Sequence, residues 1–390
     1  MTKSMIRFFL FRRFCRKSFI FNNRSIWKFS IPLQKNDFMR ILKKQILLVI
    51  GLLIILSSCE HDDPKTVKRR GERQIYVLTS EGHIYDLMGD KIKELPDCEY
   101  ASEIISDGDD YFVSGKNSKG KVGYWKNGKW NTLHLDFIDD VEHETQGIAK
   151  WDYYIYLFDY PFILKNSGIF PLDDCEDFNP SGRCLAVSNG KCYLTGMEYH
   201  GDDNLPNDAV LYYEHKGRYA KAILPKPSPD LSGHATCIHA YDTFHTIVGG
   251  HVGHEPCIWV DQQLQVLPRI CNPPTPEYDL PLGHVSSVTK LNGHIYACGY
   301  EEDDNSNMRA VLWVDGVPQF VQSPRQEKMR FSFADELIAY GDDLYMLTFE
   351  CYEQKLANGE TENNIDILIW MNDRVIAKYN RIDVVNFAVV

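Results

Sequence analysis

The sequence predicts an all-β fold built from repeated four-stranded units. Three observations support this prediction. No sustained 3.6-residue period of apolar residues follows residue 59, short runs rich in Val, Ile, Tyr and Trp recur along the chain, and turns containing glycine or asparagine separate them. These runs therefore have the composition and length of strands rather than of helices.

One pattern recurs around a series of bulky anchor residues. In the stretch HIYACGY, Tyr296 is followed three residues later by Gly299 and is preceded eight residues earlier by Val288. Spacings of 37 to 53 residues separate the successive anchors, which is the range expected for propeller blades. The anchors, two of which (Tyr156 and Tyr345) lack the glycine, are Phe112, Tyr156, Tyr193, Thr246, Tyr296 and Tyr345.

Each anchor lies in the second of four short runs, and the two ends of the chain complete one further unit. IYVLTSEGHIYDLMGDKIKELP near the start supplies three runs, and DVVNFAVV at the end supplies one. We therefore expect a β-propeller of about seven four-stranded blades, closed by strands from both termini, because unclosed hairpins would leave exposed edges. Six or eight blades are the alternatives, since the unit around Tyr156 is irregular.

The blades are similar to Kelch-type blades in their glycine-ended second strand and their tryptophan-ended third strand. A double glycine, however, occurs only as Gly249-Gly250. The resemblance is therefore to Kelch-like but non-standard blades.

The segment after Met39 has the features of an export signal. A basic stretch, an apolar run from Ile46 to Leu56 and the sequence LSSC follow one another. The run is shorter than the roughly 20 residues that span a bilayer comfortably. It resembles the lipobox of bacterial lipoproteins, which implies that Cys59 is lipidated and becomes the mature N-terminus; a membrane anchor or buried helix with an incidental Cys is the alternative.

These features divide the chain into four parts. We expect residues 1–38 to be an extension or a wrongly assigned start, 39–58 a lipoprotein signal peptide, 59–73 a flexible tether and 74–390 the propeller domain. The acidic residues just after Cys59 resemble the tag that sends some Gram-negative lipoproteins to the cell surface. The expected location is therefore the outer membrane, with the lipid anchor as membrane partner and the chain facing the cell surface; the inner leaflet is the alternative.

Charge excludes one class of partner. The first 58 residues contain 12 Lys or Arg and one acid, whereas the remainder contains 30 bases and 53 acids, a net charge of −23. Nucleic-acid binding requires clustered Lys and Arg, so a nucleic-acid partner is not expected. We expect a monomeric domain instead, with a glycan or an envelope protein as its partner.

Cysteine and tryptophan are interpreted as core residues. Nine cysteines follow Cys59, with no CxxC or metal-finger spacing, so free thiols are expected, with one or two disulfides as the alternative. Trp125, Trp259, Trp313 and Trp370 recur at one repeat position, which favours packing between blades over sugar stacking.

The loops differ between the two faces of the expected propeller. First-to-second and third-to-fourth strand turns are short and contain Asn-Gly or Asp-Gly, whereas the connections on the other face are long and irregular. Binding residues usually lie on such loops, so this loop-rich face is the expected binding face. Its exposed ligand-stacking candidates are Tyr199, Tyr278 and Tyr352.

Residues at the start of each innermost strand should surround the channel mouth on the loop-rich face. This reasoning gives Tyr100, Glu144, Ser181 (next to Arg183), His234, His284, Phe333 and Asp383. His234 and His284 with a carboxylate have the chemistry of a metal site or of an acid–base pair, but polar groups at such a mouth also bond neighbouring strands or water. No cofactor is predicted, and a divalent metal, here or in the acidic loops 201–208 and 301–304, is the alternative.

The sequence thus predicts a lipid-anchored, non-enzymatic binding module for a glycan, a peptide or a partner protein. The alternative is a polysaccharide lyase or hydrolase with His234, His284, Glu144 and Arg183 at the channel mouth. Its site would require these side chains to converge beside an open cleft. Glycine-rich phosphate loops, G-x-S-x-G and H-E-x-x-H are absent from the sequence.

Overall fold

A computed structural model describes the unit Arg73–Val390. The described residues are 73–132, 145–159, 161–166, 168–172, 175, 177–200, 205–271, 281–324, 329–355, 361–380 and 382–390. The signal peptide, the lipidation residue Cys59 and nearly all of the expected tether lie outside them. The described residues form strands, and they contain no helix long and apolar enough to cross a membrane.

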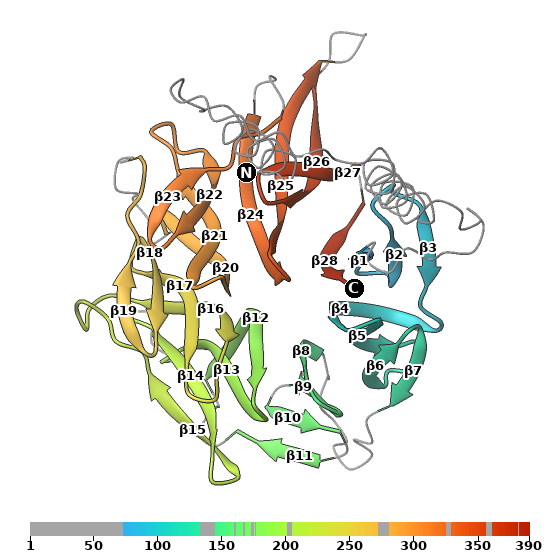
Figure 1. The fold of residues 1–390 in the computed structure, drawn as a ribbon. Helices are drawn as coiled ribbons and strands as arrows, with labels where there is room; N and C mark the ends of the chain where they lie inside the picture. Colours follow the sequence, from blue (N-terminus) through green and yellow to red (C-terminus); the bar gives the residue numbers. More distant parts are fainter. Residues whose placement is uncertain are drawn as a thin grey trace, which may run out of the picture. The chain divides into compact units, whose positions relative to one another are not determined.

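The strands form five separate four-stranded sheets and one eight-stranded sheet in a β-propeller arrangement (Figure 1). One sheet contains β28 (Val384–Val389), β1 (Ile75–Thr79), β2 (His83–Tyr85) and β3 (Lys91–Glu94). The next contains β4 (Cys98–Asp107), β5 (Asp110–Asn117), β6 (Val122–Lys126) and β7 (Lys129–Thr132). A third contains β8 (Thr145–Trp151), β9 (Tyr154–Asp159), β10 (Phe162–Lys165) and β11 (Gly168–Pro171).

The remaining strands complete the arrangement. The eight-stranded sheet contains β12 (Phe178–Ser188), β13 (Lys191–Glu198), β14 (Asp208–His215), β15 (Arg218–Ile223), β16 (Gly233–Ala240), β17 (Thr246–Val252), β18 (Glu255–Val260) and β19 (Gln263–Val266). Two more four-stranded sheets follow: β20 (Gly283–Leu291), β21 (His294–Glu302), β22 (Met308–Val314) and β23 (Val317–Phe320), then β24 (Met329–Tyr340), β25 (Asp343–Lys355), β26 (Thr361–Met371) and β27 (Arg374–Asn380).

The structure therefore does not contain the seven separate four-stranded blades that the sequence predicted. Five sheets have four strands, and an eight-stranded sheet occupies the place of two expected blades. Its two antiparallel halves are joined by one parallel pair, between Arg183 of β12 and Cys237 of β16. The sequence repeat could not predict this pair, because it depends on the approach of two innermost strands and not on either half alone.

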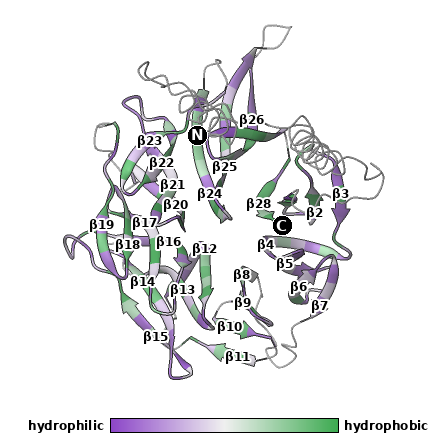
Figure 2. Cartoon of the chain, in the orientation of Figure 1, coloured by the Kyte–Doolittle hydropathy of each residue, from purple (hydrophilic) through white to green (hydrophobic). Residues whose placement is uncertain are grey.

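The first and last strands pair with each other. β1 and β28 are antiparallel partners from Ile75, opposite Val389, to Thr79, opposite Val384. The pairing agrees with the expectation that both termini complete one sheet. Figure 2 shows β28 as mainly hydrophobic and the outermost strand β3 as mainly hydrophilic, as expected for strands at opposite edges of a sheet.

A hydrogen bond between a tryptophan and a proline recurs between successive four-stranded units, twice between separate sheets and once between the two halves of the eight-stranded sheet. Trp259 of β18 is fully buried, and its indole N–H donates to the carbonyl of Pro225, which follows β15, at 2.8 Å. Leu224, just before this proline, packs in the same hydrophobic cluster as the indole. Equivalent bonds join Trp125 to Pro96 at 3.1 Å and Trp313 to Pro268 at 2.9 Å.

The interpretation of the four tryptophans as core residues is confirmed, since all four are buried. Trp370 differs in its partner, because its indole donates to the Thr348 hydroxyl of its own sheet at 2.8 Å. The β23 connection that precedes its sheet has no Leu-Pro pair. A repeated Leu-Pro thus accompanies the tryptophan bonds that link one four-stranded unit to the next.

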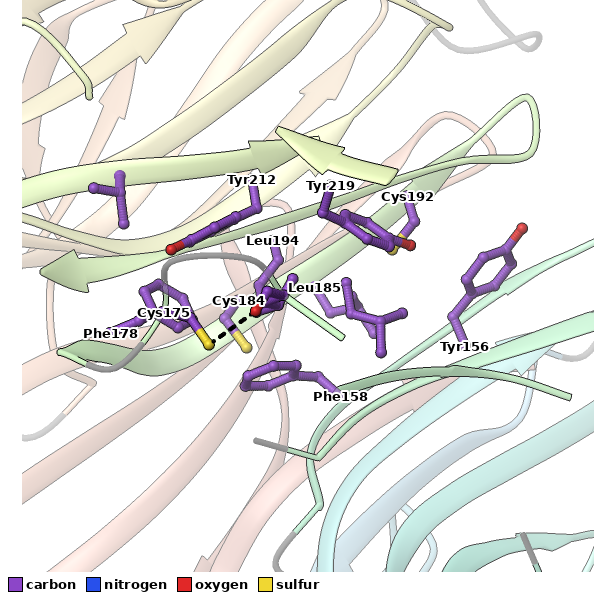
Figure 3. Packing of buried hydrophobic residues seen from close by; sticks show 13 residues of the cluster. Tyr156, Phe158, Cys175, Phe178, Cys184, Leu185, Cys192, Leu194, Tyr212 and Tyr219 are labelled. Carbon is purple, nitrogen blue, oxygen red and sulfur yellow. Dashed lines mark hydrogen bonds between the residues drawn. The ribbon is translucent and has the colours of Figure 1, made fainter. Parts of the chain in front are cut away.

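The cysteines also lie where the sequence placed them. All nine cysteines after Cys59 are free thiols, and seven of them are buried. Figure 3 shows Cys175, Cys184 and Cys192 among the aromatic and aliphatic side chains that pack β9 against the sheet containing β12, β13 and β14. They therefore act as small core residues.

The glycine of the repeat is required by a close backbone approach. A Cβ atom on Gly299 would lie 1.8 Å from the His284 carbonyl oxygen, next to a register shift between Val285 and Ser287. In the neighbouring repeat the equivalent contact is between Gly250 and the His234 carbonyl, at 1.9 Å. The anchor spacing had selected Gly249, so the sequence pattern was wrong by one residue there.

Asparagine or aspartate closes each of five third-to-fourth strand turns. Asn127, Asn166, Asp261, Asp315 and Asn372 have φ angles of 49–59°. Each side chain accepts the backbone N–H that begins the second strand of its sheet, at 2.9–3.0 Å. These residue types tolerate the left-handed conformation and mimic a backbone acceptor, which explains the tight turns expected on this face.

We expect Trp259→Phe to lower the free energy of unfolding by about 2 kcal/mol, from the lost hydrogen bond to Pro225 and the smaller buried ring. Trp151→Phe, at an exposed site, should change it by less than about 0.5 kcal/mol. Urea unfolding of both variants measures the difference. Equal stability of the two would contradict a structural role for the tryptophan–proline bond.

Candidate functional site

Two of the expected channel-mouth residues are brought together. His234 and His284 are each the second residue of an innermost strand, β16 and β20, and their ring centroids are 6.4 Å apart. A third imidazole, that of His251 in β17, lies 5.3 Å from each of them. Its Nδ1 is 3.0 Å from Nδ1 of His284, so one ring donates to the other.

His251 was missed by the sequence reasoning. It lies directly opposite His234 in the β16–β17 ladder, where Gly250 faces Ala235. The signal that could have identified it is the segment GGHV. If Gly250 rather than Gly249 is taken as the glycine of the repeat, His251 falls opposite His234 in the hairpin.

Burial keeps these imidazoles neutral. It lowers the pKa of His251 to about 3, with further contributions from the neighbouring His284 and His234 rings. Burial and the His234 ring lower the pKa of His284 to about 4, and burial also lowers the pKa of His234. Neutral, partly buried rings that bond to one another have the properties of a structural cluster.

Arg183 takes part in a different group of residues. Its Nη1 donates to the Asp335 carbonyl at 2.8 Å, and its Nη2 contacts the carboxylates of Asp335 at 3.1 Å and Glu336 at 3.0 Å. Burial opposes the charge on Arg183, but the Glu336 and Asp335 carboxylates outweigh it and raise its pKa. The guanidinium therefore links β12 to β24 instead of facing a substrate together with the histidines.

Two carboxyl groups belong to this cluster: Glu336 is buried, and Glu103 is half-buried. Glu336 accepts the N–H of Phe387 in β28 at 3.3 Å, and Glu103 of β4 accepts the N–H of Ile148 in β8 at 2.8 Å. Burial raises the pKa of each to about 7, although Arg183 acts in the opposite direction on both. The sequence reasoning did not select Glu103 or Glu336, because nothing local distinguishes them from other strand carboxylates.

A cavity of about 450 Å³ lies beside this cluster. Its lining comes from the second halves of β4, β8, β12, β16 and β20, with Leu337 of β24. These strand ends lead into the short hairpin turns, so the cavity lies toward the face with short turns. The three histidines are not part of its lining.

A larger groove of about 750 Å³ lies on the loop-rich face. One side is the β21–β22 connection with the start of β22, and the other is the start of β24 with Glu353 of β25. Its lining consists of Asn305, Ser306, Asn307, Met308, Arg309, Met329, Arg330, Phe331 and Glu353.

Asp303 organises one side of this groove. Its carboxylate accepts the backbone N–H groups of Asn305 and Asn307 at 2.9 and 3.0 Å and the Arg309 Nε–H at 2.9 Å. Burial opposes ionisation, but these bonds outweigh it and lower the pKa of Asp303. On the other side, Arg330 Nε donates to Glu353 at 2.7 Å.

The acidic loops use several of their carboxylates internally. Asp303 bonds its own loop, and Glu301 accepts the N–H groups of Ile270 and Cys271 at 2.8 and 3.1 Å. In the other loop, Asp208 binds Lys226 at 2.7 Å, while residues 201–204 lie outside the described part. Within the described ranges, no group of three or more His, Cys, Asp or Glu is arranged to hold a metal ion.

The other candidates are distributed over several elements. Tyr100 is exposed in β4, Tyr199 is exposed just after β13, and Phe333 of β24 stacks on Phe349 at 4.8 Å. Exposed Asp383, just before β28, accepts a hydrogen bond from the Ser80 hydroxyl. Glu144, Tyr278 and the side chain of Ser181 lie outside the described part of the chain.

The prediction for Tyr352 was wrong. The residue lies in β25, which extends to Lys355, and not in a loop. Its side chain is buried, and its hydroxyl donates to Asp366 at 3.3 Å. Strand pairing between β25 and β26 continues past the point where the sequence pattern became polar, which places this ring inside the protein.

No protein-family model matches the chain, and no curated protein sequence matches it. Among solved structures, the chain is similar to a puromycin-hydrolyzing peptidase of Mycobacterium tuberculosis, with 11% identity, a TM-score of 0.46 and coverage of 77% of this chain and 47% of the peptidase. The chain thus spans about half the length of that peptidase.

Two other structures also show similarity. AofleA from Arthrobotrys oligospora has 13% identity, a TM-score of 0.40 and coverage of 82% and 92% of the two chains. The Aleuria aurantia lectin, in complex with Fucalpha1-6GlcNAc, has 10% identity, a TM-score of 0.36 and coverage of 73% and 96%. One fold can carry many functions, so similarities of this size assign no ligand or activity.

The histidine cluster predicts a loss of stability in acid. Because the folded-state pKa values of His251 and His284 lie below the ordinary value of 6.5, the unfolded chain binds more protons as the pH falls below 6.5. Each imidazole should therefore cost about 2 kcal/mol of stability between pH 7 and pH 5. Glu103 and Glu336 act in the opposite direction over this range, since their folded-state pKa values are raised.

A comparison of variants separates these contributions. Urea unfolding at pH 7 and pH 5 should show that His251→Leu loses about 2 kcal/mol less stability than the wild type on acidification. His215→Leu, at an exposed site, should follow the wild type. Parallel pH dependence of His251→Leu and the wild type would contradict a neutral, buried imidazole at this position.

Proposed function

We propose that this protein is a non-enzymatic binding module of the bacterial cell envelope that holds a glycan in the groove of its loop-rich face. The observation that carries the proposal is the groove itself, about 750 Å³ in volume and bounded by amide, guanidinium and carboxylate side chains. Planar groups of this kind form paired hydrogen bonds with neighbouring sugar hydroxyls. Met308, Met329 and Phe331 supply apolar surface for the C–H faces of a sugar ring.

The organisation of the groove favours binding. Asp303 fixes the loop that carries Asn305 and Asn307, and Glu353 holds Arg330. A site that is already ordered loses less conformational entropy when the ligand binds. A peptide or a partner protein on the same groove is the other outcome that a binding screen would reveal.

The enzymatic alternative receives less support from the described residues. His234 and His284 lie close together, but they pack with a third neutral imidazole, that of His251. The Arg183 guanidinium binds Asp335 and Glu336 instead of facing the histidines. Release of new reducing ends or unsaturated sugars from a polysaccharide by the wild-type chain would favour the lyase or hydrolase instead.

We infer that the eight-stranded sheet consists of two blades, which gives seven in all. Each half has the antiparallel order of the separate sheets, and the single parallel pair between Arg183 and Cys237 is their only described ladder contact. The Kelch-like character of the blades rests on the sequence resemblance alone.

The location follows from the N-terminal sequence. We propose that Cys59 carries the lipid, that residues 59–73 are a flexible tether, and that the domain is monomeric and faces the cell surface from the outer membrane. A tether of this length would allow the loop-rich face to reach a glycan away from the membrane.

Arg330→Ala should weaken glycan binding at least about tenfold, because it removes a charged hydrogen-bond donor from the groove. The matched control is Arg374→Ala, whose side chain is 83% exposed at the start of β27, just after a short turn on the opposite face. Binding of the full-length wild type and both variants is measured on a printed glycan array and then by calorimetry. If the wild type binds a glycan and both variants bind it equally well, the groove is not the site.

Cys59→Ser should abolish lipidation and leave the uncleaved precursor, because the resemblance to a lipobox assigns the thiol as the acylated group. Detergent phase partitioning of a bacterium that expresses each form measures the effect: wild type in the detergent phase with a mass increase, Cys59→Ser without the increase. Identical masses of the mature wild-type and variant chains, apart from the substitution, would contradict the anchor.

A further inference from the structure

The wall of the central cavity, the cavity of about 450 Å³ beside Arg183, contains both charged and apolar side chains. Its apolar lining includes Ile105, Ile148, Leu185, Val187, Ile238 and Val288. Its charged lining includes Glu103, Asp107, Lys150 and Arg183. The Asp107 side chain is 56% exposed, so the cavity reaches solvent at this end of the strands.

Each cation of the wall already has an anionic partner. Lys150 pairs with Asp107, and Arg183 pairs with both Asp335 and Glu336. One oxygen of Glu103 accepts the Ile148 N–H, and no ion pair within the described ranges involves Glu103. With all groups ionised, the wall therefore has an excess of negative charge, contributed by Glu103 and by the second carboxylate on Arg183.

A carboxylate without a countercharge is unfavourable in such surroundings. Removing a carboxylate from water is unfavourable unless a proton or a cation compensates its charge. The space beside Glu103 is large enough for a small organic molecule, and its hydrophobic lining favours one with a hydrocarbon portion.

We propose that the central cavity is a second binding site, which takes a small organic cation with its primary ammonium group on the Glu103 carboxylate and its hydrocarbon portion against Ile105, Ile148 and Ile238. The site is independent of the glycan groove, since the two have no lining residue in common. An anion would meet excess negative charge there, and a neutral polyol would leave that charge uncompensated.

Binding to Glu103 also requires a particular pH dependence. Burial raises the pKa of Glu103 to about 7, and a bound ammonium group favours the ionised form, so affinity should fall as the pH falls below 7. Glu336, with a pKa of about 7, changes affinity in the same direction. The other charged groups around it are Arg183, Asp335, Lys150 and Asp107. The neighbouring thiols of Cys184 and Cys237 have pKa values raised by burial, and burial, with Lys290, keeps His239 neutral with a pKa of about 4.

The test uses three probes that differ only in their polar group: cyclohexylammonium, cyclohexanol and cyclohexanecarboxylate. Calorimetry with the full-length chain at pH 8 should show binding of cyclohexylammonium at least about tenfold tighter than of either other probe. Glu103→Gln keeps an acceptor for the Ile148 N–H and should weaken ammonium binding at least about tenfold. Glu301→Gln is the matched control, because the Glu301 carboxylate likewise accepts backbone N–H groups but lies outside the cavity.

Three results would overturn the proposal: no preference for the ammonium probe, equal loss in both variants, or equal wild-type affinity at pH 8 and pH 5.5. The last measurement needs no variant, so the test stands even if Glu103→Gln does not fold. Failure of the glycan groove would be seen separately, as equal glycan binding by wild type and Arg330→Ala, and would leave this result unaffected.

Discussion

The pairing of β28 with β1 is the constraint on which the rest of the structure depends. It joins residues more than three hundred positions apart, and reciprocal bonds between Gln74 and Val390, at 2.9 and 2.7 Å, extend the ladder beyond the strands. Without β28, the innermost edge of β1 would be open, and unpaired strand edges invite association with other chains. The closing strand also contacts both of its neighbours, since Ser106 of β4 donates to the Val389 carbonyl at 2.6 Å and Glu336 of β24 accepts the Phe387 N–H.

This closure explains why charged groups are held inside the unit. Glu336 meets Arg183 and Phe387 only because β12, β24 and β28 converge on the same centre. Buried ion pairs of this kind are weak evidence for added stability, but removal of one partner leaves an uncompensated charge. Toward the loop-rich face, β16, β17 and β20 hold the neutral histidine cluster. The groove lies on the same face, between the β21–β22 connection and the start of β24. The same scaffold thus keeps the charged central cavity apart from the polar groove of the loop-rich face.

The sequence predicts those features that arise within one repeat. Strand composition and the Asn and Asp turns arise within single units, and the tryptophans recur at one position of the repeat; the structure contains them all. Completion of one sheet by both termini was also predicted, because the first and last units were incomplete in complementary ways.

Features that depend on contacts between repeats were not predicted. A one-residue difference between hairpins made Gly250 rather than Gly249 the glycine that lies against a backbone carbonyl, and it concealed His251 opposite His234. The added length of β25 buried Tyr352. The positions of Arg183, Glu103 and Glu336 depend on which innermost strands face one another, and the periodicity of a single strand contains no such information. The parallel pair that merges two sheets has the same cause.

Native-state hydrogen exchange of the full-length chain tests the closure most directly. The amides of Val384–Val389 should exchange as slowly as those of β17 and β21, because β28 would then open only with the whole unit. Exchange of these amides within minutes, while β17 and β21 remain protected, would show that the last strand is not an integral part of the fold. That result would contradict closure of the propeller by β28.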